Sequence, residues 1–204
     1  VDYGISINGI DIVDTSANIA AMSTALVTAI VAANADAGPD DTTVSSSDNG
    51  AMTLSVAVAN AVFDVTGAAA ETDGSNYADY SLSDTAANLA NANAGLVNFA
   101  QAVTATGDPA TYAEAGTLSG RTTMGTAVQY NVEVAAADGL AAGAALNSAV
   151  NITTSDAQDI ADAIVLNGAT NSGSTSYAIS GVSTTFTSAV VTTQASISAA
   201  VEAA

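Results

Sequence analysis

Apolar residues recur along this chain with two different spacings. Ile19, Met22, Leu26, Ile30 and Ala33 follow one another every three or four residues, which places them on one face of a helix. Shorter runs before and after such stretches alternate every second residue, as expected of a strand with one buried face. The pattern predicts helices and strands in alternation.

The same helical pattern returns seventy residues later along the chain. The second predicted face consists of Leu89, Ala92, Leu96, Ala100 and Val103. Each helix is expected to begin at an aspartate N-cap, Asp14 or Asp84, whose carboxylate can accept free backbone N–H groups. Each is expected to stop before a Gly-Pro or Gly-Asp-Pro turn.

This spacing belongs to a sequence repeat. Residues 13–20 return as residues 83–90, and the only two prolines, Pro39 and Pro109, keep the same offset of 70. A weaker third copy covers residues 154–161, where Ser155 and Gln158 form a capping-box pair and the helix is expected to end near Gly168. A long repeat of this kind indicates a supersecondary unit that is duplicated and stacked.

Strands are predicted around the helices. A hairpin turn is expected at Asn8-Gly9, between two alternating apolar runs. A final Ala-rich segment, residues 193–204, reads as a frayed helix. The predicted strands are residues 10–12, 52–58, 61–65, 80–82, 130–134, 150–152, 176–180 and 183–187.

The sequence therefore predicts an α+β fold with internally repeated strand–helix–strand units of about 70 residues. A β-sandwich with short helices is the alternative. The predicted division is an N-terminal hairpin plus first repeat (1–83), a second repeat (84–154), and a partial third repeat with a C-terminal segment (155–204).

Charge excludes some classes of partner. The 204 residues contain 20 Asp and Glu but only one Lys or Arg, so the formal net charge is −19. Nucleic acid and anionic membranes need Lys and Arg, so neither is an expected partner. No apolar run approaches the roughly 20 residues of a membrane span. The near absence of Lys and Arg leaves almost no trypsin sites, which suits an extracellular protein.

The missing residue types argue against an enzyme. His, Cys and Lys are all absent, which removes the usual triads, Schiff-base lysines and zinc sites. Carboxylate pairs for glycoside hydrolysis remain as an alternative. The one cation, Arg121, is expected either in a buried ion pair or subunit contact, or on the surface.

Calcium is the ligand that the oxygen-rich turns favour. Two stretches supply clustered carboxylate and amide oxygens of the kind that hard cations bind, although neither has the spacing of an EF-hand. Asp, Asn and Gly also favour turns for conformational reasons alone, which is the other interpretation. The candidate ligands are Asp73, Asn76 and Asp79 in one stretch, and Asp36, Asp40 and Asp41 in the other.

The Asp-Thr-[Ser/Ala]-Ala-Asn-[Ile/Leu]-Ala motif and the Ala/Thr/Asn-rich composition resemble repeats of large secreted bacterial surface proteins, of the kind found in RTX-type adhesins and S-layer-like coats. The resemblance covers residues 13–20, 83–90 and 154–161. It implies a cell-surface location. The glycine-rich nonapeptide of the RTX family is absent, so its calcium-binding roll is not implied.

We therefore expect a non-enzymatic extracellular structural protein, a subunit or module of a surface layer, sheath or filament that self-assembles with copies of itself. A calcium-dependent adhesin that binds a glycan or host surface is the alternative. If the two full copies are equivalent, Leu26 and Leu96 occupy the same core position, and their truncation should cost similar stability. Thr28 and Asn98, on the opposite helix sides, should tolerate change.

Overall fold

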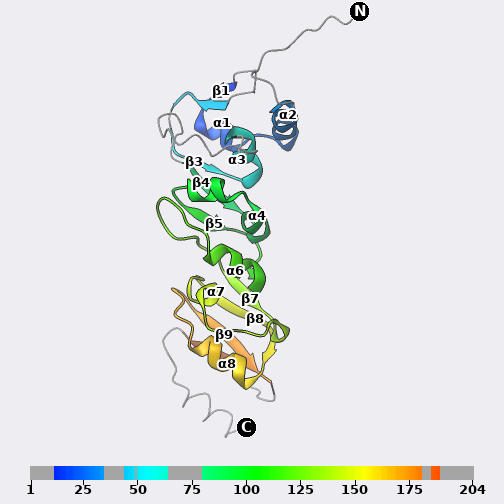
Figure 1. Ribbon diagram of the computed structural model, residues 1–204, viewed down its shortest axis with the longest axis vertical. Helices are drawn as coiled ribbons and strands as arrows, with labels where there is room; N and C mark the ends of the chain where they lie inside the picture. Colours follow the sequence, from blue (N-terminus) through cyan, green and yellow to red (C-terminus); the bar gives the residue numbers. More distant parts are fainter. Residues whose placement is uncertain (1–11, 35–43, 49, 64–79, 181–184, 189–204) are drawn as a thin grey trace, which may run out of the picture. The chain divides into compact units, whose positions relative to one another are not determined.

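The computed structural model describes residues 12–34, 44–48, 50–63, 80–180 and 185–188 (Figure 1). The chain forms two compact units, which interleave along the sequence. Unit 1 takes residues 1–83, 92–102 and 123–125, and unit 2 takes residues 84–91, 103–122 and 126–204. The three-part division by sequence repeats stays a prediction.

Unit 1 is built from strand–helix–strand crossovers with parallel strands. Strand β1 (Ile12–Asp14) leads through helices α1 (Ser16–Ala20) and α2 (Thr24–Asn34) to β2 (Val44–Ser46), which pairs parallel to β1. Strand β3 (Met52–Leu54) leads through α3 (Val56–Phe63) to β4 (Tyr80–Asp84), again in parallel. Backbone bonds from Gln101 to Tyr80 and from Leu82 to Ala102 extend this sheet.

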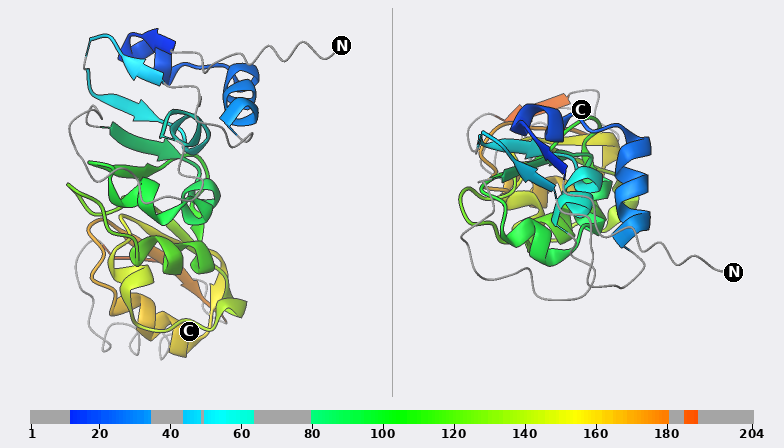
Figure 2. Two further views of the ribbon diagram at one scale, coloured as in Figure 1. Left: turned by 45° about the horizontal axis from the view of Figure 1, so that its top comes forward. Right: turned by 90° about the horizontal axis from the view of Figure 1, so that it is seen from above.

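Helix α3 contacts two other helices of unit 1. Helix α3 packs against α2 and also against α5 (Ala94–Asn98) (Figure 2). Alternate residues of β3 and β4 are buried beneath them, as expected where one face of a sheet is covered. Among the larger apolar side chains of this unit, five are 1% exposed or less: Ile19, Leu54, Leu82, Leu96 and Val97.

Unit 2 contains further strand–helix–strand crossovers, and the strands of its five-stranded sheet lie side by side in the order of the chain. Its elements are α4 (Ala86–Asn91), β5 (Val103–Ala105), β6 (Ala110–Thr111), α6 (Tyr112–Ser119), β7 (Val132–Val134), the 3-10 helix η1 (Ala136–Asp138), α7 (Ala144–Asn147), β8 (Ile152–Gln158), α8 (Ile160–Asn167), β9 (Thr175–Ile179) and β10 (Thr185–Ser188). The five-stranded sheet has the order β10-β9-β8-β7-β6. Strands β6 to β9 are parallel, and β10 is antiparallel to β9.

The parallel strands of unit 2 repeat at a short interval. Ala110 pairs with Val132, Val132 with Ile152, and Ile152 with Thr175, so neighbouring strands lie 22, 20 and 23 residues apart (110 to 132, 132 to 152, 152 to 175). Helix α6 packs against both α4 and α7, so these helices share one side of the sheet. Each layer of strand and helix thus contacts its neighbours along the chain, as in repeat proteins.

The α+β prediction is confirmed, and the β-sandwich alternative is wrong because the described strands form mostly parallel pairs joined by helices. The seventy-residue spacing holds locally. Helices α1 and α4 begin at residues 16 and 86, and α2 and α5 begin at residues 24 and 94. Each predicted long helix is broken into two short ones, and Val103 lies in strand β5.

Several predicted elements are wrong in detail. Residues 52–58 begin as a strand but turn into helix α3 after Ser55, whose side chain accepts from the Val58 N–H at 3.2 Å. Residues 61–63 continue that helix instead of forming a strand. In the third copy, Ser155 and Gln158 lie in β8, and α8 begins one turn later with Asp159 as its N-cap. Its predicted end at Gly168 is confirmed.

The predicted strands at 130–134 and 176–180 are confirmed as β7 and β9 within a residue or two. The strand predicted at 183–187 corresponds in part to β10. The hairpin at Asn8-Gly9 and the helix at residues 193–204 lie outside the described residues.

Candidate functional site

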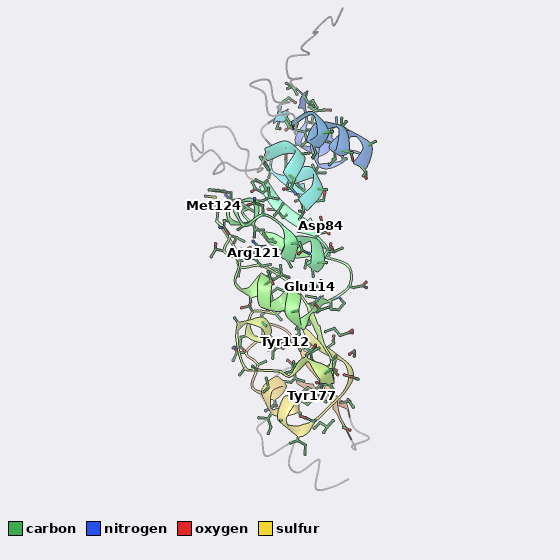
Figure 3. All side chains as sticks on the ribbon, turned by 45° about the vertical axis from the view of Figure 1, so that its right-hand side comes forward. Asp84, Tyr112, Glu114, Arg121, Met124 and Tyr177 are labelled. Atoms are coloured by element: carbon green, nitrogen blue, oxygen red, sulfur yellow. The ribbon has the colours of Figure 1, made fainter. Side chains whose placement is uncertain are left out.

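The repeated motif builds the same polar turn twice, at the carboxyl ends of β1 and β4. Asp14 Oδ1 accepts from the Thr15 N–H and from Asn18 Nδ2, both at 2.7 Å. The second copy repeats this arrangement, with both distances to Asp84 Oδ1 at 2.8 Å (Figure 3 labels Asp84). An aspartate and an asparagine therefore lie together on the surface at each turn.

The N-cap of each of these helices is a threonine. Thr15 Oγ1 accepts from the Asn18 N–H at 3.3 Å, and Thr85 Oγ1 makes the same bond to the Asn88 N–H at 3.2 Å. The prediction that Asp14 and Asp84 cap the helices is therefore wrong by one residue. The aspartates instead fix the strand-to-helix turn by binding the threonine N–H and the asparagine side chain.

The first copy contains a polar cluster that the second copy lacks. Asp48 Oδ1 accepts from Ser16 Oγ and Ser46 Oγ, both at 2.6 Å, and from the backbone N–H groups of Ser16 and Gly50. These bonds, those of Ser16 and Ser46 foremost, hold the pKa of the Asp48 carboxyl well below its usual range. The residue equivalent to Ser16 is Ala86, which is buried, at 3% exposed.

An asparagine ladder links successive layers of unit 2. Asn131 Oδ1 accepts from Asn151 N–H at 3.2 Å and Asn151 Nδ2 at 2.9 Å. Asn151 Oδ1 then accepts from the Ser174 N–H at 2.9 Å and Ser174 Oγ at 3.1 Å. The three residues immediately precede β7, β8 and β9, so the ladder follows the stacking of the strands. Asn151 also begins the sequence Asn151-Ile152-Thr153, which fits the N-glycosylation pattern. Its side-chain amide is hydrogen-bonded in the ladder on both sides.

The ladder was not predicted, although the sequence carries a signal for it. Asn131-Val132 and Asn151-Ile152 each place an asparagine before a β-branched residue that starts a strand, twenty residues apart. The seventy-residue repeat obscured this shorter interval.

Other acidic side chains of unit 2 bind backbone N–H groups. Asp159 caps α8 by accepting from the Asp162 N–H at 2.9 Å, and Asp162 accepts from the Leu140 N–H at 3.2 Å. Asp156 accepts from the Ala136 N–H at 2.8 Å, and Glu114 closes a capping box with Thr111 at the start of α6. These carboxylates act as structural acceptors in loops and at helix starts.

Arg121 binds within unit 2. Its guanidinium group donates to the Ala90 carbonyl oxygen at 2.7 Å, near the carboxyl end of α4, where a positive charge is favourable (Figure 3). The side chain is half-buried. This contact helps join α4 to the segment that follows α6. The predicted ion pair or subunit contact stays a prediction.

Two buried tyrosines bind helix carbonyls. The Tyr80 hydroxyl donates to the Leu96 carbonyl at 2.6 Å, and the Tyr130 hydroxyl donates to the Ala145 carbonyl at 2.9 Å. Loss of hydration on burial raises the pKa of each hydroxyl to about 12. Both therefore act as neutral donors that tie a strand region to a helix.

The predicted calcium ligands Asp36, Asp40, Asp41, Asp73, Asn76 and Asp79 lie outside the described residues. Within the part of the chain that the structure describes, no group of three or more His, Cys, Asp or Glu side chains is arranged to hold a metal ion. In that same part, no helix is both long enough and apolar enough to cross a membrane. The calcium assignment stays a prediction.

Large apolar side chains are exposed at a few places that could bind another surface. Leu26 on α2 is 41% exposed, and Ile160 and Ile164 on α8 are 50% and 41% exposed. Such residues mark interaction surfaces when they gather on one face of an element. The remaining exposed large apolar residues among those described are Val13, Val31, Phe99 and Met124.

The chain matches no protein-family model, no curated protein and no solved structure among those with which it was compared.

Proposed function

We propose that this chain is a non-enzymatic extracellular structural protein, a module of a surface layer, sheath or filament that self-assembles. The observation that carries the proposal is the stacking of strand–helix layers in unit 2, where β6, β7 and β8 each pair in parallel with the following strand along the chain. Architectures of this kind extend by adding layers, because every layer contacts only its neighbours.

The use of polar side chains supports the same function. Asp14, Asp84 and Asp159 bind N–H donors at turns and helix starts, and the asparagine ladder binds layer to layer. In these places, carboxylates and amides stabilise a repeated shape. This use of polar side chains fits a structural protein built from repeats of one folded unit.

The composition supports an extracellular setting. A single Lys or Arg in 204 residues leaves one peptide bond for proteases that cleave after basic residues. The net charge of −19 also makes neighbouring copies repel one another at low ionic strength. Salt or divalent cations should therefore promote assembly.

Negative-stain electron microscopy and light scattering test the proposal. Purified protein at high concentration, in salt or calcium, should form ordered polymers with a regular repeat. A particle that stays strictly monomeric under these conditions would contradict it. Asp73→Asn and Asp40→Asn variants, compared by calorimetric calcium titration, test whether the two predicted oxygen clusters bind the cation.

The alternative function is a calcium-dependent adhesin or glycan-binding module. The paired Asp and Asn side chains at the carboxyl ends of β1 and β4 favour it, since ligands of parallel sheets bind at that end of the strands. A glycan array with and without chelator separates the two functions. Saturable, chelator-sensitive glycan binding without polymers would decide for the adhesin.

A further inference from the structure

Strand β8 contains a bulge of two extra residues where it pairs with β9. Thr153 pairs with Ser176, and the next pair is Ala157 with Ala178. Three residues of β8 therefore lie opposite a single residue of β9, Tyr177. The pairs β6–β7 and β7–β8 of the same sheet are matched residue by residue. Bulges redirect side chains, so the residues after this one show what it changes.

The bulge determines which side chain of β8 is buried at the end of the strand. Gln158 lies opposite Ile179, and both are buried. If the pairing of Thr153 with Ser176 continued without a bulge, Asp156 would lie opposite Ile179 instead (153 to 156, 176 to 179). The alternation of buried and exposed positions is the same in both registers, because the shift equals the two-residue period of a strand. At this position the two registers differ in whether Gln158 or Asp156 is buried.

The charge of Asp156 explains why the bulged register is the one observed. In this register Asp156 is exposed, and its Oδ1 accepts from the Ala136 N–H at 2.8 Å and from Gln158 Nε2 at 3.1 Å. The regular register would place an ionised carboxylate on the buried face of the sheet, opposite an isoleucine. Burying a charge without a partner of opposite sign is strongly unfavourable.

The bulged register has a cost of its own. Gln158 is 0% exposed, and its Nε2 donates to the Asp156 carbonyl oxygen at 3.0 Å as well as to the carboxylate. Its Oε1 is buried and has no hydrogen-bond partner among the described residues. A buried acceptor without a donor is unfavourable, and the regular register would release this side chain into the connection to α8. Each register therefore buries one polar group at a cost.

The surroundings of the bulge leave room for a change of register. Strand β7 pairs with β8 only as far as Thr154, and the chain after β7 continues as η1. The residues of the bulge are therefore paired with β9 on one side and bonded to η1 through Asp156 and Ala136 on the other. In the regular register the two extra residues would lengthen the connection between β8 and α8, so α8 need not move.

We propose that β8 has two registers against β9 and that the negative charge of Asp156 holds it in the bulged one. Neutralising this carboxylate removes the cost of burying it and favours the regular register, in which Ser155 instead of Ala157 pairs with Ala178. The end of β8 is thus a conformational switch that responds to the charge of one side chain.

Substitution isolates the charge of Asp156 better than acid does. The other charged groups on the elements around the bulge are also carboxylates, and carboxyl groups lose their charge together in acid. They are Glu133 on β7, Asp138 on η1, the cap residue Asp159, and Asp162 on α8. The experiment therefore changes Asp156 alone at neutral pH.

Cysteine cross-linking distinguishes the two registers, because the chain has no cysteine of its own. Directly paired residues on neighbouring strands lie about 5 Å apart, within the range for a disulfide. Ala157→Cys with Ala178→Cys reports the bulged register, and Ser155→Cys with Ala178→Cys reports the regular one. With Asp156 unchanged, mild oxidation should cross-link the first pair and not the second. With Asp156→Val added, the ratio of yields should shift at least about tenfold toward the second pair, because no carboxylate is buried.

Two further variants complete the test. Glu133→Val is the matched control, because it removes one negative charge from an exposed position of the neighbouring strand β7 and should leave both yields unchanged. Asp156→Asn, which keeps an acceptor for the Ala136 N–H, is a milder neutral variant and should give both cross-links. Circular dichroism checks that each variant is folded. Unchanged yields in both Asp156 variants, or the same shift with Glu133→Val, would overturn the proposal. Because dilute monomeric protein is used, the result is independent of the proposed self-assembly.

Discussion

The two full copies of the repeat share a motif and a local turn, yet they differ in what surrounds them. In both copies an aspartate binds the following threonine and an asparagine, and two short helices begin at equivalent residues. Leu96 is nevertheless buried and Leu26 is exposed. The motif therefore determines the local backbone, and the neighbouring layer determines which side chains become core.

The same comparison explains Ser16 and Ala86. Each is the first residue of a short helix and each is buried. In the first copy Asp48 lies close enough to bind the serine hydroxyl, whereas Ala86 is buried without a polar group that would need a partner. Equivalent positions in a repeat can thus carry a hydrogen-bonding side chain in one copy and an apolar side chain in the other when their surroundings differ.

The largest predicted difference between the copies concerns the two leucines. Leu96→Ala should lower the free energy of unfolding by about 2–5 kcal/mol, because it leaves a cavity in the core. Leu26→Ala should cost less than about 1 kcal/mol, because the side chain is 41% exposed. This replaces the sequence-based expectation of equal effects.

Chemical denaturation of the monomeric protein measures both leucine variants. Thr28→Ala and Asn98→Ala provide the baseline, since both side chains are exposed as predicted and should change stability by less than about 0.5 kcal/mol. Equal losses for Leu26→Ala and Leu96→Ala would show that the layers do not differ as described.

The next largest effect concerns the position that is a serine in the first copy, Ser16, and an alanine in the second, Ala86. Ala86→Ser should destabilise the protein by about 1–3 kcal/mol, because it buries a hydroxyl group where the first copy has a bonded one. Ser16→Ala should cost about 1 kcal/mol through the loss of its bond to Asp48. Thermal denaturation compares the two variants, and a neutral Ala86→Ser would mean that a partner is within reach in the second copy too.

The helix caps should behave alike in the two copies. Thr15→Ala and Thr85→Ala each remove one side-chain acceptor at a helix start, so each should cost about 1 kcal/mol. Replacement by Ser, which keeps the acceptor, should restore most of the loss. A clear difference between the two threonines in urea denaturation would mean that the shared turn is not equally stabilising.

Acid should weaken the Asp48 cluster. The pKa of Asp48 is lowered in the folded protein, so its stabilising contribution is present above the pKa of the unfolded chain, about 4, and is lost as the pH falls below that value. Asp48→Asn should reduce this part of the acid sensitivity. Melting temperatures between about pH 2 and pH 6 report the change, and identical pH profiles for the variant and the unmodified chain would contradict the assignment.

Local structure was largely predictable from the sequence. The second predicted helix face, Leu89 to Val103, is buried at every position, and the strand before it is β4. The turn into α3 was missed because Met52, Leu54, Val56 and Val58 are large apolar residues at every second position, a spacing that fits a strand. Ser55 was the signal for a helix start, since a serine followed by an Ala- and Val-rich run favours an N-cap.

Long-range contacts were not predictable from the same patterns. The spacing of apolar residues says that Leu26 and Leu96 face inward, but it does not say whether a neighbouring layer lies there. The Ser16–Asp48 bond joins residues 32 positions apart, and nothing in the local sequence indicates it. The parallel pairing of strands was likewise not predictable from the sequence, because it depends on how each helix crosses over the sheet.

Native-state thiol labelling tests most directly whether layer stacking decides burial in this protein. Leu26→Cys and Leu96→Cys variants, each with a single thiol, are exposed to a maleimide reagent at low protein concentration in native buffer. We expect Leu26→Cys to react at nearly the rate of the unfolded chain, and Leu96→Cys to react only after the protein unfolds. Equal labelling rates for the two native variants would contradict it.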